Sequence, residues 1–122
     1  MVLKYFLDTY AIFEIIKGNK NYDPYIDVEC FTTILQLYEL YFHLLRAFGA
    51  AVAETYFQKY LSLKLEITDE NIPKAAAFRL KHLKQNISYA DALGYTIAQE
   101  KGFLFLTGDK EFRDYPDVAF VK

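Results

Sequence analysis

The chain of 122 residues contains no tryptophan, one cysteine, three prolines and five glycines. The single cysteine, Cys30, excludes an internal disulfide, and its apolar surroundings predict a buried thiol in a reducing compartment. No apolar run approaches the roughly 18 residues of a membrane span, and the N-terminus shows neither a basic leader nor a cleavage motif. We therefore expect a cytoplasmic protein without a membrane segment.

An excess of positive charge is also missing, because the formal net charge is −2. Bulk positive charge is the usual mark of a nucleic-acid-binding protein, so its absence weighs against a nuclease unless bound divalent cations reverse the local charge. Aromatic residues are abundant instead, with eleven tyrosines and eleven phenylalanines. One small core does not bury so many rings comfortably, so we expect some of them at a protein interface.

The order of apolar segments predicts one α/β domain over residues 1–122. Strands are expected at residues 2–7, within 26–32, and at 65–68, 103–106 and 118–121. Helices are expected at residues 9–17, 33–48, 50–62, 69–85 and 88–102, with a loop at 19–24 and a helical turn at 110–113. This alternation predicts a central, mainly parallel sheet covered on both faces, with all strands ending at one edge.

Four carboxylates lie close to the points where predicted strands lead into helices: Asp8, Glu39, Asp91 and Asp109. Asp8 and Asp109 directly follow predicted strands, and an open α/β sheet binds its ligands beyond the carboxyl ends of the strands. Glu39 lies in an apolar helical segment, where a carboxylate is costly to bury unless it is paired or binds a metal. Converging acids repel one another unless a cation lies between them, so the set indicates a metal-dependent enzyme.

Each acid also has an ordinary structural explanation, and these alternatives stay open. They are an N-cap for Asp8, an ion pair with His43 or Arg46 for Glu39, a capping box with Ser88 for Asp91, and a turn after Gly108 for Asp109.

Four short motifs resemble those of PIN-domain ribonucleases, most closely the toxins of VapC type. They are Leu7-Asp8-Thr9, Leu37-Tyr38-Glu39-Leu40, Tyr89-Ala90-Asp91-Ala92 and Leu106-Thr107-Gly108-Asp109-Lys110-Glu111-Phe112. No single motif is specific, but their order and spacing match the family over nearly the whole chain. Tyr10 departs from the pattern, because many relatives carry a small polar residue there.

The resemblance implies a three-layer α/β/α fold and a site of Asp8, Glu39, Asp91 and Asp109 that binds Mg²⁺ or Mn²⁺. Thr107 would support this site through its hydroxyl. Oxygen ligands alone suit such hard cations, so His43 and His82 are interpreted as surface or packing residues. A cation-activated water would then attack a phosphodiester, with one or two ions.

Contacts to a substrate phosphate are expected first from Lys110, beside Asp109. The predicted helix at 69–85 offers a weaker alternative, with Lys74, Arg79, Lys81 and Lys84, while its apolar face is expected to contain Ile72, Ala76, Leu80 and Leu83.

The resemblance thus implies an endoribonuclease, specifically a toxin restrained by a cognate antitoxin, and a homodimer formed through residues 33–48 and 50–62. A catalytically inert protein-binding module and a PIN-type RNA-processing nuclease remain as alternatives. A phosphoacceptor or phosphohydrolase on a similar sheet is disfavoured, because Asp8-Thr9-Tyr10 lacks the second acid that those sites carry after the first strand. The RNA target is left open.

Overall fold

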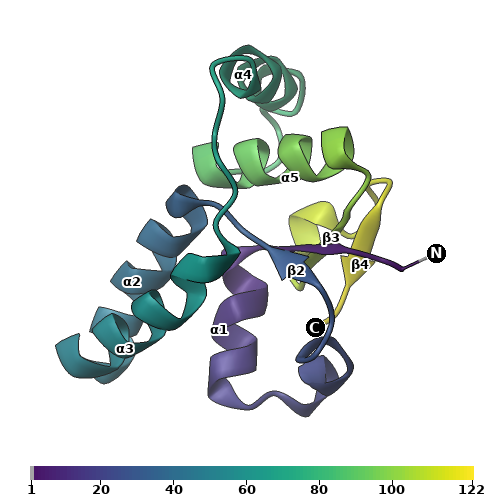
Figure 1. Ribbon diagram of the computed structural model, residues 1–122. Coiled ribbons are helices and arrows are strands. Elements are labelled where there is room, and N and C mark those ends of the chain that lie inside the picture. Colours follow the sequence, from purple (N-terminus) through teal and green to yellow (C-terminus); the bar gives the residue numbers. More distant parts are fainter. Residues whose placement is uncertain (1) are drawn as a thin grey trace.

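The computed structural model describes residues 2–122 and has three layers (Figure 1). The central sheet contains β1 (Tyr5–Leu7), β2 (Cys30–Phe31), β3 (Leu104–Thr107) and β4 (Val118–Phe120). These strands lie in the order β2-β1-β3-β4, and every neighbouring pair is parallel. The carboxyl ends of the strands therefore share one edge, as the alternation of elements predicts.

Five α-helices pack around the sheet: α1 (Thr9–Lys17), α2 (Ile34–Phe48), α3 (Ala50–Tyr60), α4 (Asn71–Lys81) and α5 (Tyr89–Lys101). Figure 1 shows α4 and α5 on one side of the sheet and α1, α2 and α3 on the other. Successive strand residues point to opposite faces. Phe6 and Phe105 accordingly join the core beneath α5, while Leu7 and Leu106 join the core beneath α1 and α2.

The predicted helix ends are confirmed where capping residues mark them. Asp8 caps α1 and Gly18 ends it, while Ser88 and Gly102 do the same for α5. Thr33 caps α2, with its hydroxyl accepting a bond from the backbone N–H of Leu35. These side chains satisfy helix-end groups that would otherwise lack partners, so the boundaries are encoded locally.

Two short segments differ from expectation. The predicted strand at 65–68 is wrong, because only an isolated parallel bridge between Thr32 and Lys64 forms at that edge of the sheet. The expected loop at 19–24 contains a 3₁₀ helix, Lys20–Tyr25, which Asn19 caps through its side chain. Short 3₁₀ turns use the same polar and proline-containing sequences as loops, so the sequence does not separate them.

The helix expected at 69–85 is shorter, and its predicted apolar face is wrong. Ile72, Leu80 and Leu83 are exposed by 55%, 70% and 61%. Ala75 is buried and Phe78 packs against the core beneath α5 instead. A helix can present small residues to a neighbour at close range, and apolar periodicity alone does not detect that arrangement.

Cys30 is half-buried rather than fully buried. Many rings are fully enclosed, including Phe6, Tyr22, Tyr95, Phe105 and Phe112, whereas others lie exposed, including Tyr38, Phe42, Phe48 and Tyr89. None of the helices formed by residues 2–122 combines the length and apolar character that crossing a bilayer requires.

Candidate active site

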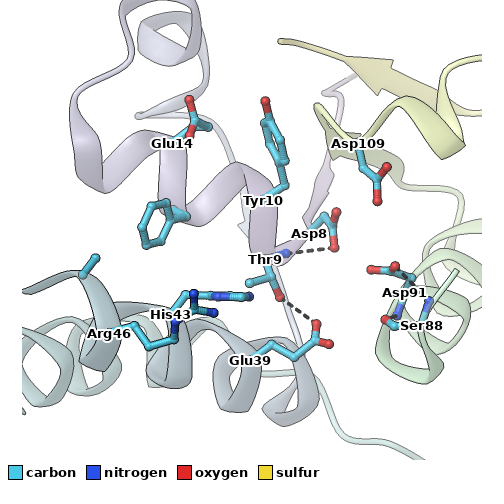
Figure 2. A pocket seen from close by; sticks show the side chains of 12 residues that line it. Asp8, Thr9, Tyr10, Glu14, Glu39, His43, Arg46, Ser88, Asp91 and Asp109 are labelled. Carbon is cyan, nitrogen blue, oxygen red and sulfur yellow. Dashed lines mark hydrogen bonds between the residues drawn. The ribbon is translucent and has the colours of Figure 1, made fainter. Parts of the chain in front are cut away.

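A cavity of about 610 Å³ lies at the carboxyl edge of the sheet, where α1, α2 and the start of α5 meet (Figure 2). The four acids singled out by the sequence, Asp8, Glu39, Asp91 and Asp109, all line it. Thr107 stands next to them through its contact with Asp8. The fold thus brings together residues that are far apart in the chain, from Asp8 to Asp109.

Asp8 occupies the join between β1 and α1 and is only 2% exposed. Its Oδ1 accepts a bond from the backbone N–H of Thr9 at 2.9 Å, and its Oδ2 accepts one from the Thr107 hydroxyl at 2.7 Å. Burial raises the pKa of Asp8 well above its usual value, and the nearby charge of Asp91 raises it further. Asp8 is therefore both the helix cap and a member of the cavity, so the two interpretations are compatible.

Thr107 ends β3 and connects two of the acids. Its hydroxyl donates to Asp8 and accepts the backbone N–H of Asp109 at 3.0 Å. Asp109 in turn accepts the backbone N–H of Glu111 at 3.0 Å and caps the short 3₁₀ helix Lys110–Phe112. This chain of bonds fixes the carboxylates of both strand ends relative to the sheet.

Gly108 is needed between Thr107 and Asp109 because the Tyr10 ring lies against it. A β-carbon at this position would overlap the Tyr10 ring and the Val121 carbonyl oxygen. Tyr10, whose role the sequence left open, therefore lines the cavity beside the loop that carries Asp109.

Asp91 enters the cavity from the first turn of α5. It forms the capping box with Ser88: the Ser88 hydroxyl accepts the backbone N–H of Asp91 at 3.0 Å, and Asp91 Oδ2 accepts the backbone N–H of Ser88 at 3.1 Å. Burial raises the pKa of Asp91 to about 6; the Ser88 bonds lower it in part, and the charge of Glu39 raises it. The ordinary explanation for Asp91 is thus correct, and its second oxygen still faces other acids.

Glu39 comes from the middle of α2, where the Thr9 hydroxyl lies 3.4 Å from its Oε1. The same hydroxyl donates to the Gln36 carbonyl oxygen at 3.1 Å, which ties α1 to α2. Burial raises the pKa of Glu39. The alternative of an ion pair with His43 or Arg46 is not observed in the described residues, whose three ion pairs involve other side chains.

The separation between Glu39 and Asp91 depends on a close approach of α2 and α5. The buried Gln36 donates from Nε2 to the Ala90 carbonyl oxygen at 2.6 Å, one residue before Asp91. A β-carbon at Gly94 would lie 2.6 Å from Gln36 Nε2 and 2.8 Å from a ring carbon of Phe6. Only glycine therefore allows α5 to pack this closely on β1 and α2.

The four acids line the cavity but do not converge on a single point. Within residues 2–122, no three His, Cys, Asp or Glu side chains stand close enough together to hold a metal ion as they are. Lysine and arginine also do not neutralise them, because the three ion pairs of this part of the chain lie elsewhere. Burial raises the pKa of three of the acids, Asp8, Glu39 and Asp91. No basic side chain offsets this effect, so the site lacks compensating positive charge.

The sequence did not predict the rest of the cavity lining. It contains Tyr10, Phe13, Glu14, His43, Arg46, Ala47 and Ser88. His43 is a surface residue, as interpreted from the sequence, and it also lines the same cavity as Glu39. The spacing of Glu39, His43 and Arg46 by four and three residues was the available signal, since it places all three on one face of α2. Lys110 and the cations of α4 do not line the cavity.

The sequence matches the family profile described as PIN domain over residues 5–118. The structure is similar to that of Mycobacterium tuberculosis VapC20, described as a sarcin–ricin loop cleaving toxin. The TM-score is 0.73 at 18% identity, covering 93% of this chain and 98% of that one.

A chain of DNA-bound VapBC from Salmonella typhimurium is also similar, with a TM-score of 0.74 and 16% identity over 98% of this chain and 97% of that chain. A chain of a toxin–antitoxin complex from Klebsiella pneumoniae has a TM-score of 0.73 and 16% identity over 94% and 95%. No curated protein sequence matches. At these identities the structural likeness establishes a shared fold.

Proposed function

The chain belongs to the PIN-domain family, and on that premise we propose that it is an endoribonuclease dependent on Mg²⁺ or Mn²⁺. PIN domains are generally nucleases. One observation carries the proposal: Asp8, Glu39, Asp91 and Asp109 reach a single cavity from four separate parts of the fold. Ligand sites of parallel α/β sheets lie at this edge.

The donor set fits a hard divalent cation. All four side chains offer oxygen, which Mg²⁺ and Mn²⁺ prefer. Each carboxylate oxygen has two lone pairs, so the bonds from Thr9, Thr107, Ser88 and Glu111 leave every acid with free acceptor capacity. Because burial raises the pKa of Asp8, Glu39 and Asp91, a bound cation would displace protons from them.

The chain's own residues would bind the cation and fix its position. A bound divalent cation would supply an activated water and neutralise charge on the phosphodiester. Asp8 would bind it from a fixed position, because Thr9 and Thr107 hold both of its oxygens. Asp91 would bind it from the opposite wall, where the Ser88 capping box fixes the rotamer. Glu39 and Asp109 would complete the ring of acceptors.

We further propose that the protein is the toxin of a type II toxin–antitoxin system. Support comes from the similar structures, which include a VapC toxin, a VapBC assembly and a toxin–antitoxin complex. The partners would be an RNA substrate, a cognate antitoxin and a second copy of the chain. Exposed rings on α2, such as Tyr38, Phe42 and Phe48, offer apolar area for a protein contact.

Cleavage of a labelled single-stranded RNA by the purified protein tests the nuclease. We expect cleavage with Mn²⁺, none with EDTA, and none with Asp91→Asn, which keeps the size of the side chain and removes its charge. Asp114→Asn is the matched control, because Asp114 is exposed and lies outside the cavity lining. Full cleavage in EDTA would contradict metal dependence.

Growth of a bacterial host after induced expression tests the toxin. We expect the wild type to arrest growth. Asp91→Asn, expressed at an equal protein level, should allow normal growth. Robust RNA cleavage without growth arrest would instead favour an RNA-processing nuclease. Absence of both cleavage and any Mn²⁺-dependent stabilisation would favour the inert binding module.

A further inference from the structure

The cavity continues beyond the acids into a second region of different chemistry. Figure 2 shows Asp8, Asp91 and Asp109 on one side, with His43 and Arg46 on α2 on the other. We call this second region the α1–α2 end; it is lined by Phe13 from α1 and by His43 and Arg46 from α2.

The basic side chains follow Glu39 along one face of α2. A rise of 1.5 Å per residue places His43 about 6 Å and Arg46 about 10 Å from Glu39 along the helix axis. The cavity thus changes from acidic to basic within two helical turns. A phosphate near the acids would need a cation, whereas a phosphate near Arg46 would already meet one.

The basic groups of this end are free to bind an anion. Neither His43 nor Arg46 takes part in the ion pairs found within residues 2–122, and both are exposed. The Arg46 guanidinium lies over the Phe42 ring at 5.5 Å, which orients it without neutralising it. The remaining acid of the cavity lining, Glu14, is already paired with Lys17 at 2.7 Å and accepts a bond from Asn19 at 2.8 Å.

The rings of this end are held in place by aromatic neighbours. Phe13 packs against His43 edge-on at 6.3 Å and beside Phe48 at 6.2 Å. These contacts make a fixed apolar wall, on which a flat ring or a ribose can pack without ordering loose side chains.

We propose that the α1–α2 end binds the nucleotide adjacent to the scissile phosphate of unpaired RNA. Arg46 and His43 bind the neighbouring backbone phosphate as N–H donors, and Phe13 packs against the base or ribose. The inference rests on the proposed nuclease function and assigns the residues of this chain that bind the substrate beside the acids. The RNA is unpaired because a base within a duplex is stacked on its neighbours and cannot reach rings that line a cavity.

Binding of a labelled single-stranded RNA, measured by fluorescence anisotropy with Mg²⁺ in the cleavage-deficient Asp8→Asn background, tests the subsite. Adding Arg46→Gln should weaken binding about tenfold, or about 1.4 kcal/mol, and His43→Gln should weaken it less. Lys81→Gln is the matched control, since it removes the same charge from an exposed site outside the cavity lining. Its effect should stay within about twofold. A duplex of the same sequence should bind at least about tenfold more weakly than the single strand.

Each contrary outcome identifies what has failed. Equal losses from Arg46→Gln and Lys81→Gln would overturn the subsite, because charge alone would then explain them. Equal affinity for the duplex would overturn the assignment to unpaired RNA. Unchanged RNA binding by Arg46→Gln, together with lost binding of an inhibitory protein, would assign this end to that protein instead. Failure of the parent variant to bind RNA, with no cleavage by the wild type, would defeat the proposed function itself. An unchanged melting temperature of Arg46→Gln verifies its fold.

Discussion

The two ends of the cavity are built in opposite ways. At the acidic end, Asp8 is buried and the other acids are partly buried, and bonds from Thr9, Thr107 and Ser88 hold Asp8 and Asp91. The α1–α2 end presents exposed basic side chains on a helix surface, with aromatic contacts as their main restraint. A site for chemistry needs acceptors fixed near the backbone, whereas a site for recognition tolerates longer, more mobile side chains. Variants of each end should therefore have different effects on metal binding, stability and RNA binding.

Asp8→Asn should have the largest effect and should affect only the acidic end. We expect cleavage to fall on the order of 10³-fold, because the buried charge that would hold the cation is lost. Melting in EDTA should occur at the same or a higher temperature, since asparagine still caps α1 and no longer places a charge among acids. Affinity for single-stranded RNA should fall much less than cleavage does. A large drop in melting temperature would show that Asp8 acts mainly in folding.

The pH dependence of stability without metal should also depend on the acidic end of the cavity. Burial raises the pKa of Asp91 to about 6, above the unfolded value of about 3.9. The folded state therefore binds this proton more tightly, so its stabilising effect is present below pH ~4 and disappears as the pH rises through 6. The loss is on the order of 3 kcal/mol.

Thermal unfolding in EDTA at pH 4 and pH 7.5 measures this loss. Asp91→Asn should flatten the dependence, and Mn²⁺ should restore stability at pH 7.5. A melting temperature that rises with pH in the absence of metal would contradict the account.

Thr107→Val tests the bonds that fix the acids at the strand ends. Valine has a similar shape but cannot donate to Asp8 or accept from Asp109. We expect Mn²⁺ affinity to fall about tenfold to a hundredfold, as for other residues that orient metal ligands. Thr107→Ser keeps the hydroxyl and should retain most of the affinity. Equal behaviour of both variants would remove the hydroxyl from the explanation.

Gly94→Ala should have the smallest effect and tests the spacing of α2 and α5. The added methyl would press on Gln36 and Phe6, at an expected cost of about 1–3 kcal/mol, partly offset by about 1 kcal/mol of helix propensity. Mn²⁺ affinity should fall as well, because Glu39 and Asp91 move apart. Combining the change with Gln36→Ala should give a non-additive loss in chemical denaturation. Full additivity would argue against a direct clash.

The sequence predicts those parts of the fold whose signals are local. Asp8 and Gly18 mark the ends of α1, and apolar runs followed by acids mark β1 and β3. Parallel strands then place Asp8 and Asp109 at one edge by topology alone. For the same reason, these acids could be proposed as a set before their contacts were known.

Features that depend on contacts between elements distant in the chain could not be predicted from the sequence. The exposed Ile72 and Leu80 of α4 show a face chosen by close packing on α5 rather than by apolar periodicity. His43 and Arg46 became part of the cavity only because α1 packs beside α2. Nothing in the sequence marks Gly94, because Gln36 and Phe6 approach it only in the folded chain.

A Mn²⁺ titration of thermal stability at pH 7.5 tests the division of the cavity most directly, with wild type, Asp8→Asn and Arg46→Gln compared side by side. A cation that binds only the folded state raises its melting temperature in proportion to the logarithm of its concentration. The account predicts equal shifts for the wild type and Arg46→Gln and little or none for Asp8→Asn. An equal shift in all three proteins, or no shift in the wild type at millimolar Mn²⁺, would contradict it.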